Sequence, residues 1–545
     1  MSDKLPSANP DLDLANAPSA NEIDPSHLHR REFLKIASAG TGALLAAGCA
    51  ATPRLTPVTG MTSRSKPAGG DVGQVVVIGA GAWGSWTTYH LRQRGVRVTH
   101  IDQYGAGNSR STSGDETRGV RSSYGDRTTV ALWSKWARAS IVRWGEFDKE
   151  WAPVFKTRFY VTTGDVIMRS ADEPFLKLTR EQWTKDGVKH EVIDGAECRK
   201  RWPVIKSDDI TIAITEPDAG VVRARASTQA VAAIGQKMGA NFVLGRVHLG
   251  PIVNGNLDGV ILDDGTVIRG DQYVFCCGPW LRKLFPQLME NRMRVPLGYV
   301  MYYGTPIGDS RFTYPNLPSF NFPGVTGWPV LPVDSRGFRV RGGVAAIPPA
   351  APGATGALPG APTTVVGAAA PPGAPAVAAR PPATGAATGA AAGAATGTAG
   401  DATTGPAGAK STTPAIVAPP ADPTLTDPDL STRWASAERL EGTRRFVEQR
   451  FPALAKAPLL ETRSCHYESS VNKDFIIDHV PDLRNAWIAG VGQAEGFKFS
   501  PIVGEYIAQR VMGIDGDPAL IKAFKMPTEV YDPPAPPKPG DEEEL

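Results

Sequence analysis

Apolar residues recur along the chain with the spacings of strands and helices in turn. An uninterrupted apolar run, Val75 to Ile78, predicts a buried parallel strand. A helical pattern follows through Trp86 and stops near Gly95, and residues 96–101 predict a second strand. Strand, helix and strand in this order predict an α/β fold.

Similar patterns continue downstream until the composition changes. Helical spacing covers 132–151, 226–238 and 438–451, and strand patterns cover 158–168, 241–244, 273–277 and 475–488, with a hairpin turn at 263–265. Residues 348–420 are almost wholly Ala, Gly, Pro and Thr. Such a segment lacks large apolar side chains to offset the entropy cost of ordering, so it predicts an unfolded insertion. Residues 1–29 and 50–72 are interpreted as a leader and a linker, and the Pro-rich end as a solvated tail.

The overall charge excludes some partners. The chain has 545 residues, 41% hydrophobic residues and a net charge of +3. This is enough for one large two-lobed enzyme. A nearly balanced charge has neither the basic surface of a nucleic-acid-binding protein nor the character of an acidic tail. We expect a small-molecule partner and no nucleic acid; the sequence does not indicate an oligomeric state.

The first fifty residues carry an export signal. His29–Lys35, with Arg30 and Arg31, matches the twin-arginine pattern, and the apolar stretch 36–47 is too short to span a bilayer. A chance arginine pair is the alternative. The residues before Cys49 resemble a bacterial lipobox. The alternative is cleavage of the signal near this point without lipidation. We expect export by the twin-arginine machinery to the periplasm, or to an extracytoplasmic membrane face through a lipid anchor on Cys49.

The run after the first strand predicts a dinucleotide site. Gly79, Gly81 and Gly84 give G-x-G-x-x-G: the first permits the tight turn, the second a close approach of the pyrophosphate, the third close packing of helix on strand. The helix N-terminus favours phosphate, and Asp102 ends the second strand where an acid binds a ribose hydroxyl. A Gly-rich turn in an unrelated α/β domain is the alternative, and it leaves Asp102 unexplained.

The remaining cysteines predict no metal site. Cys198, Cys276, Cys277 and Cys465 fit no zinc spacing. Cys276 and Cys277 lie in an apolar strand and are interpreted as small core residues.

Four separated blocks together resemble a known family. They are Gly79–Asp102 with Ser113–Gly125, Glu216–Val221, Val274–Trp280, and Cys465–Phe499. In this order they resemble the sarcosine oxidase and N-methyltryptophan oxidase group of the D-amino-acid oxidase superfamily. The resemblance implies a Rossmann-like FAD-binding lobe interleaved with a mixed-sheet substrate lobe.

The resemblance also divides the chain. It implies a leader (1–72), an FAD-binding lobe (73–158, 207–290 and the end of 426–515), a substrate lobe (159–206, 291–347 and the start of 426–515), an insertion (348–425) and a tail (516–545). The implied FAD contacts are Gly79, Gly81, Ala82, Trp83, Gly84, Asp102, Ser113, Thr117, Arg118, Val247, Gly278, Trp280, Gly496, Phe497 and Lys498.

Basic residues supply the candidate chemistry. Arg118 and Arg121 are three apart, so in a helical turn they share a face. The resemblance implies that Arg118 lies near the flavin and that Arg121 binds the substrate carboxylate. The alternative is a pair of surface arginines in salt bridges. Arg339, in Gly337-Phe338-Arg339-Val340, aligns with the family's second ligand of the substrate carboxylate. The alternative is an exposed arginine on a strand. The resemblance also implies that Lys498 lies near the flavin and takes part in catalysis.

Departures from the family shape the functional hypothesis. Covalent members of the family attach FAD through a cysteine just before a Gly-x-Lys segment, which corresponds here to Gly337-Phe338-Arg339. Residues 328–339 contain no cysteine, so we predict dissociable FAD. Residues 294–311 contain no Lys to activate oxygen, and residues 493–495 replace the family's Ser-Gly-His. The expected reaction is oxidation of the C–N bond of an amino acid or N-alkyl amino acid to an imine, with O2 as acceptor. The alternatives are a quinone or cytochrome acceptor, a non-catalytic flavin-binding interaction protein, and an NAD-dependent dehydrogenase.

Overall fold

The structure is a computed structural model that describes residues 72–127, 129–332, 336–342, 427–514 and 516–531. All of these belong to one folded unit within Lys66–Leu545. The twin-arginine segment, Cys49 and the 348–425 insertion lie outside the described residues.

The first sheet carries the predicted dinucleotide unit. Its six strands, in spatial order, are β23 (Ile476–His479), β24 (Ala486–Gly490), β15 (Gln272–Phe275), β1 (Gln74–Ile78), β2 (Arg97–Asp102) and β9 (Asn241–Leu244). Neighbouring strands are parallel except β23, which is antiparallel to β24. Val75, Val76 and Val77 are fully buried, as expected for a central strand covered on both faces.

Helices cover one face of this sheet. α2 (Ala82–Gln93) packs against α6 (Ala224–Lys237) and α11 (Ser500–Val511), and α3 (Val130–Phe155) packs on α11. Trp86, Trp144 and Ile507 are buried in their shared core. The other face packs on a three-stranded sheet, β10 (Val247–Leu249), β13 (Val260–Leu262) and β14 (Val267–Ile268). The predicted first strand, helix and second strand are thus confirmed, as is the turn at 263–265.

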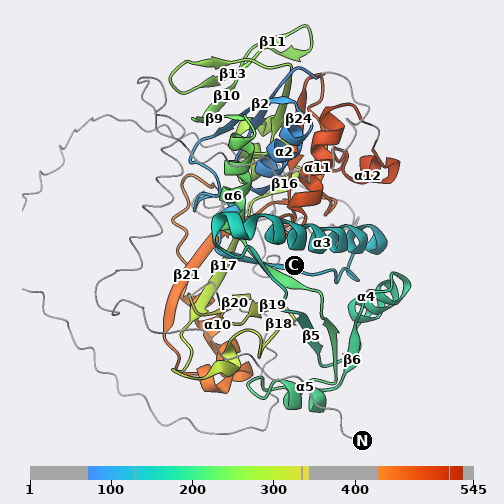
Figure 1. The fold of residues 1–545 in the computed structure, drawn as a ribbon, viewed down its shortest axis with the longest axis vertical. Helices are drawn as coiled ribbons and strands as arrows, with labels where there is room; N and C mark the ends of the chain where they lie inside the picture. The colour runs from blue at the N-terminus through green and yellow to red at the C-terminus, as the bar shows by residue number, and fades with distance from the viewer. Residues whose placement is uncertain (1–71, 128, 333–335, 343–426, 515, 532–545) are drawn as a thin grey trace, which may run out of the picture. The chain divides into compact units, whose positions relative to one another are not determined.

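The second sheet is mixed, as predicted. Its eight strands, in order, are β21 (Leu459–His466), β17 (Leu297–Tyr303), β20 (Phe338–Gly342), β19 (Val325–Trp328), β18 (Ser319–Phe322), β5 (Asp165–Arg169), β7 (Ile212–Glu216) and β6 (Glu191–Ile193). Only β18 and β5 pair in parallel. Phe320, Phe338 and Val340 pack against α10 (Ala437–Arg450) and the chain after it. Figure 1 shows the two sheets with α3 between them.

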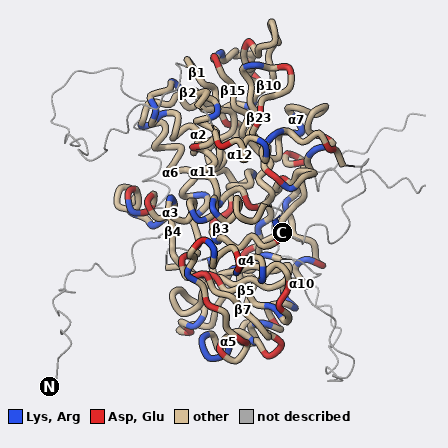
Figure 2. Tube along the Cα trace, turned by 90° about the vertical axis from the view of Figure 1, so that its right-hand side faces the viewer, with Lys and Arg blue, Asp and Glu red and all other residues tan. Residues whose placement is uncertain are grey.

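A small third sheet joins the two lobes. It consists of β3 (Thr117–Val120), β8 (Gly220–Arg223) and β4 (Tyr160–Val161). The remaining elements are α4 (Pro174–Lys185), α5 (Gly195–Arg201), α7 (Leu281–Leu284), α8 (Pro286–Met289), α12 (Pro518–Ala523), β11 (Ile252–Val253), β12 (Asn256–Leu257), β16 (Met293–Arg294), β22 (Ser469–Ser470) and four 3-10 turns, η1 (Thr112–Gly114), η2 (Gly278–Trp280), η3 (Ser310–Phe312) and η5 (Pro452–Leu454). In the view of Figure 2, basic and acidic positions are interspersed along the described chain. Among the described helices, none combines the length and apolarity that a bilayer crossing requires.

Three expectations differ from the structure. Arg118 lies in strand β3, not in a helical turn, because residues 117–120 pair antiparallel with β8. β7 falls within 207–290, which was assigned to the FAD-binding lobe, but it pairs with β5 and β6 in the eight-stranded sheet. The predicted tail begins too early, because α12 buries Leu520 and Phe524 against the core of the first lobe.

Candidate functional site

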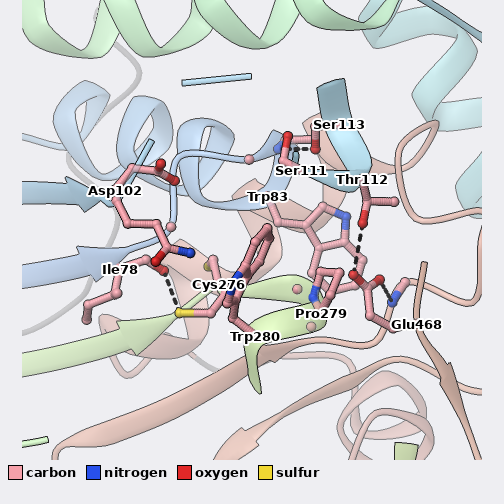
Figure 3. A pocket seen from close by; sticks show the side chains of 18 of the residues that line it. Ile78, Trp83, Asp102, Ser111, Thr112, Ser113, Cys276, Pro279, Trp280 and Glu468 are labelled. Carbon is pink, nitrogen blue, oxygen red and sulfur yellow. Dashed lines mark hydrogen bonds between the residues drawn. The ribbon is translucent and has the colours of Figure 1, made fainter. Parts of the chain in front are cut away.

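A deep cavity lies beyond the carboxyl ends of β1, β2 and β15. It encloses about 1290 Å³, including the open space at its mouth. Figure 3 shows Trp83, Trp280 and Glu468 around it, with Asp102 at the end of β2. In open α/β sheets this edge is where ligands bind.

The glycines of the turn have the predicted geometric roles. Gly79 has φ +103°, which side-chain-bearing residues rarely adopt, and a Cβ there would lie 2.3 Å from the Cys276 carbonyl oxygen. A Cβ on Gly84 would lie 1.8 Å from the Gly79 carbonyl oxygen, so α2 packs directly on the turn. Gly79 and Gly81 line the cavity, whereas Gly84 acts from behind it. The turn therefore forms a cradle without side chains, which fits a pyrophosphate.

The backbone of the turn is fixed by two neighbouring side chains. Ser113 Oγ accepts a hydrogen bond from the Ala82 amide at 2.8 Å, and Asp102 Oδ2 accepts one from the Ala80 amide at 2.7 Å. Asp102 Oδ1 also accepts from the amides of Tyr104 and Gly105, both at 2.8 Å. Burial raises the pKa of Asp102, and these three N–H donors oppose the rise. Asp102 thus holds the loop while its carboxylate lines the cavity.

Most of the predicted cofactor residues meet in this cavity. They are Gly79, Gly81, Ala82, Trp83, Asp102, Ser113, Arg118, Val247, Gly278, Trp280, Gly496 and Phe497. Trp83 Nε1 donates to the Gly496 carbonyl at 2.9 Å, which ties α2 to the segment before α11. Helix α11 begins at Ser500, so Gly496 and Phe497 lie in the turn that leads into it.

Besides Gly84, two predicted cofactor residues, Thr117 and Lys498, do not line this cavity. Thr117 is fully buried, and its hydroxyl accepts a hydrogen bond from Trp328 Nε1 at 3.1 Å. Strand β3 alternates, so Arg118 faces the cavities and Thr117 faces away from them. Lys498 lines a second cavity instead.

The wall also contains residues that the sequence interpretation missed. Cys276 and Cys277 pack with the core, as expected, and they also line the cavity. Glu468 is buried there and accepts hydrogen bonds from the Thr112 hydroxyl at 3.1 Å and the Gly492 amide at 3.3 Å. Burial raises the pKa of Glu468 to about 7. No local pattern marks these positions, because the contacts join distant segments.

A second cavity, of about 690 Å³ with its open space, adjoins the first. Both cavities are lined by Thr112, Arg118, Ala494 and Phe497. The second cavity is otherwise distinguished by its cations. They are Arg118, Arg121, Arg339, Arg341 and Lys498.

Two of these arginines share one carboxylate. Asp115 accepts from Arg118, and Arg339 Nη2 lies 3.0 Å from Asp115 Oδ2. Arg339 is 1% exposed and its guanidinium lies 3.8 Å from the centre of the Trp328 ring. The alternative of an exposed strand arginine is therefore wrong.

Arg121 projects into the same cavity without such a partner. Among the described residues, no hydrogen bond or ion pair involves its guanidinium. Burial lowers the pKa of Arg121, but Asp165 and Glu495 outweigh it and the net pKa is raised. The structure thus brings a permanently charged fork to the cavity wall, which is suited to a carboxylate.

Lys498 belongs to a buried network beside Arg121. Its ammonium donates to Tyr124 Oη at 2.7 Å and to Glu495 Oε2 at 2.9 Å, and the Tyr124 hydroxyl donates to the same carboxylate at 2.5 Å. Burial lowers the pKa of Lys498 to about 8, with Glu495 opposing and Arg121 assisting. Glu495 thus holds the ammonium of Lys498 in place.

Cys465 lies beside Arg118, the arginine that lines both cavities. Its Sγ lies 3.2 Å from Arg118 Nη2, and it lines the second cavity. Residues 328–339 contain no cysteine, whereas β21 brings this thiol to the second cavity. No cluster of metal-ligating side chains occurs in the described part of the chain.

Known proteins resemble this chain in sequence and in fold. A family model described as "FAD dependent oxidoreductase" matches residues 74–510. A monomeric sarcosine oxidase from Streptomyces avermitilis is 28% identical over 238 residues, covering 43% of this chain and 58% of that protein. An N-methyl-L-tryptophan oxidase from Citrobacter koseri is 23% identical over 258 residues, covering 46% and 63%. The chain therefore spans less than two thirds of either relative. A solved glycine oxidase from Bacillus cereus has the same fold, with TM-score 0.57, 16% identity and coverage of 84% and 99%.

Proposed function

The chain belongs to the family of FAD-dependent oxidoreductases, and we propose that it oxidises the C–N bond of an amino acid or N-alkyl amino acid to an imine. One observation carries the proposal: an arginine-lined cavity opens beside the dinucleotide cavity, with Arg118 in the wall of both. The relatives named for sarcosine and N-methyl-L-tryptophan support the same substrate class.

The first cavity fits FAD. The glycine cradle at Gly79 and Gly81 suits the pyrophosphate, Asp102 suits a ribose hydroxyl, and Val247 suits the adenine side of the cavity. When bound, FAD supplies a two-electron acceptor; the protein supplies binding, orientation and electrostatics.

In the second cavity, we assign the substrate carboxylate to Arg121 with Lys498. Arg121 has no competing partner among the described residues, and Lys498 is held in place by Glu495 and Tyr124. Holding the carboxylate fixes the α-carbon beside the junction of the cavities, which gives the rate advantage of orientation. The amine must be neutral to lose a hydride equivalent, and the surrounding cations favour the neutral amine.

Anaerobic mixing tests the reaction. Purified holoenzyme mixed with a panel of N-methyl amino acids is expected to lose its flavin absorbance band. Arg121→Gln should raise the KM for these compounds by about 10- to 100-fold, the loss of about 1.4–2.7 kcal/mol of a charge-assisted pair. Arg445→Gln, which removes a half-exposed arginine far along α10, is the matched control. A flavin that no amine bleaches would favour the non-catalytic interaction protein.

The electron acceptor is the second part of the proposal. We propose O2, with release of peroxide; a quinone is the rival because residues 294–311 provide no lysine. Mixing reduced enzyme with oxygenated buffer should restore the flavin band at least as fast as turnover. Reoxidation that is slower than turnover, but fast with a soluble quinone, would assign the dehydrogenase.

We also propose export by the twin-arginine route. The support is the motif at His29–Lys35 and the suitability of this route for a protein folded around its cofactor. Replacing Arg30 and Arg31 with lysine should retain the protein in the cytoplasmic fraction. Absence of fatty-acid label on the wild-type protein would exclude the anchor at Cys49.

A further inference from the structure

The register of the second sheet places two arginines on one face of β20, in the wall of the second cavity. In β20, Arg339 lies opposite Tyr302 of β17 and Trp328 of β19, and Arg341 lies opposite Val300 and Thr326. Residues two apart on a strand share a face. Both arginines therefore face the cavity, whereas Phe338 and Val340 between them pack in the core.

The two arginines differ in their partners. Arg339 is ion-paired to Asp115. Arg341 has no hydrogen bond or ion pair with any described residue; its guanidinium lies 6.0 Å from the centre of the Tyr467 ring and lines the cavity. Arg339 and Arg341 both lower the pKa of Arg118, after the larger effect of burial, so the three charges repel one another.

The cavity consequently has a surplus of positive charge. Three of its five cations are ion-paired: Arg118 and Arg339 with Asp115, and Lys498 with Glu495. The two arginines without partners in the described part of the chain, Arg121 and Arg341, account for that excess. A substrate with one carboxylate would neutralise only one of them.

We propose that the substrate carries two carboxylates, the α-carboxylate held by Arg121 and a second one, on its side chain or N-substituent, held by Arg341. This inference rests on the proposed function for its substrate class. It narrows that class to dicarboxylic amino acids and N-carboxyalkyl amino acids. A planar guanidinium that lacks a protein partner is suited to bind the second carboxylate with two parallel hydrogen bonds.

Binding of glutarate and its monoamide to the holoenzyme tests the inference without turnover. The two probes have the same shape and differ by one charge. Isothermal titration calorimetry should show glutarate binding about tenfold or more tightly than the monoamide. Arg341→Gln should abolish this preference while changing the affinity for the monoamide by less than about threefold.

Two further variants guard against misfolding and general charge effects. Arg341→Lys keeps the charge and should keep most of the preference, and the melting temperature of each variant reports its folding. Arg463→Gln removes a neighbouring arginine that is already paired with Glu116 and Glu461, and it should leave the preference intact. Equal affinities in the wild type, or a preference that survives in Arg341→Gln, would overturn the inference.

The result is separable from the fate of the proposed function. A preference lost in Arg341→Gln supports a two-carboxylate site even if no amine bleaches the flavin. An enzyme that oxidises N-methyl amino acids but binds both probes equally overturns this inference alone.

Discussion

Substituting Gly84 with alanine tests how the helix is seated on the dinucleotide turn. An added Cβ would lie 1.8 Å from the Gly79 carbonyl oxygen and 3.2 Å from Cys276 Cβ, whereas real Cβ contacts stay above 3.0 Å. The first obstacle is backbone, so rotating a side chain cannot relieve it. Either α2 or the turn must move.

The expected cost follows from this geometry. Overpacking a well-packed site costs about 1–3 kcal/mol. Alanine in a helix interior returns about 0.5–1 kcal/mol relative to glycine. Gly84→Ala should therefore lower the free energy of unfolding by about 1–2 kcal/mol and weaken FAD binding, because the N-terminus of α2 shifts.

Gly145→Ala is a control of opposite sign. Gly145 lies within α3, and a Cβ there would meet nothing within 4 Å. This variant should gain about 0.5–1 kcal/mol from helix propensity alone. Urea unfolding of the apoprotein, followed by tryptophan fluorescence, measures both changes, and FAD titration measures the dissociation constant. If Gly84→Ala proved as stable as Gly145→Ala, the packing argument would be refuted. A loss of FAD affinity without a loss of stability would instead place Gly84 in contact with the cofactor.

Three further predictions concern the cavities. Burial lowers the pKa of the Lys498 side chain to about 8, so it is a charged ammonium below pH 8 and a neutral amine above it. Calorimetry should therefore show the dissociation constant of butyrate rising above pH 8 in the wild type and varying less in Lys498→Met. Burial raises the pKa of the Glu468 carboxyl to about 7, so it is neutral below pH 7 and anionic above it. A fluorescence titration should therefore show FAD affinity falling from pH 6 to pH 8, and Glu468→Gln should remove that fall. Acid precipitation should release FAD into the supernatant; flavin that stays in the pellet would contradict this, and its release from Cys465→Ala would identify the attachment site.

The sequence predicted the dinucleotide unit well because its signals are local. The strand before Gly79, the glycine spacing and Asp102 all lie within one continuous strand–helix–strand unit. Spacing misled at Arg118 and Arg121, where a separation of three suggested a helical turn. Antiparallel pairing with β8 overrides that local pattern, which is a tertiary effect that spacing alone does not contain.

The substrate cavity was harder to predict because its walls come from strands distant in sequence. Arg341, Thr326 and Val300 become neighbours only through the pairing of β20 with β19 and β17. Cys465 joins them because β21 pairs with β17 opposite Gly298. A single arginine in a short strand pattern carries no sign of which face it occupies or whether an acid lies beneath it. Arg339 was identified by resemblance, and Arg341 was missed.

One short segment nevertheless contributes to both cavities, which explains why it carried so much of the prediction. Ser113 binds the amide of Ala82 at the start of α2, and Asp115 pairs with two arginines of the second cavity. Arg118 then reaches the wall shared by both cavities, and Arg121 lies further into the second. Because β3 crosses from one cavity to the other, a shift of this strand would alter cofactor binding and substrate binding together. Variants at Asp115 should therefore affect both dissociation constants, whereas variants at Arg341, which lines only the second cavity, should affect mainly that of the substrate.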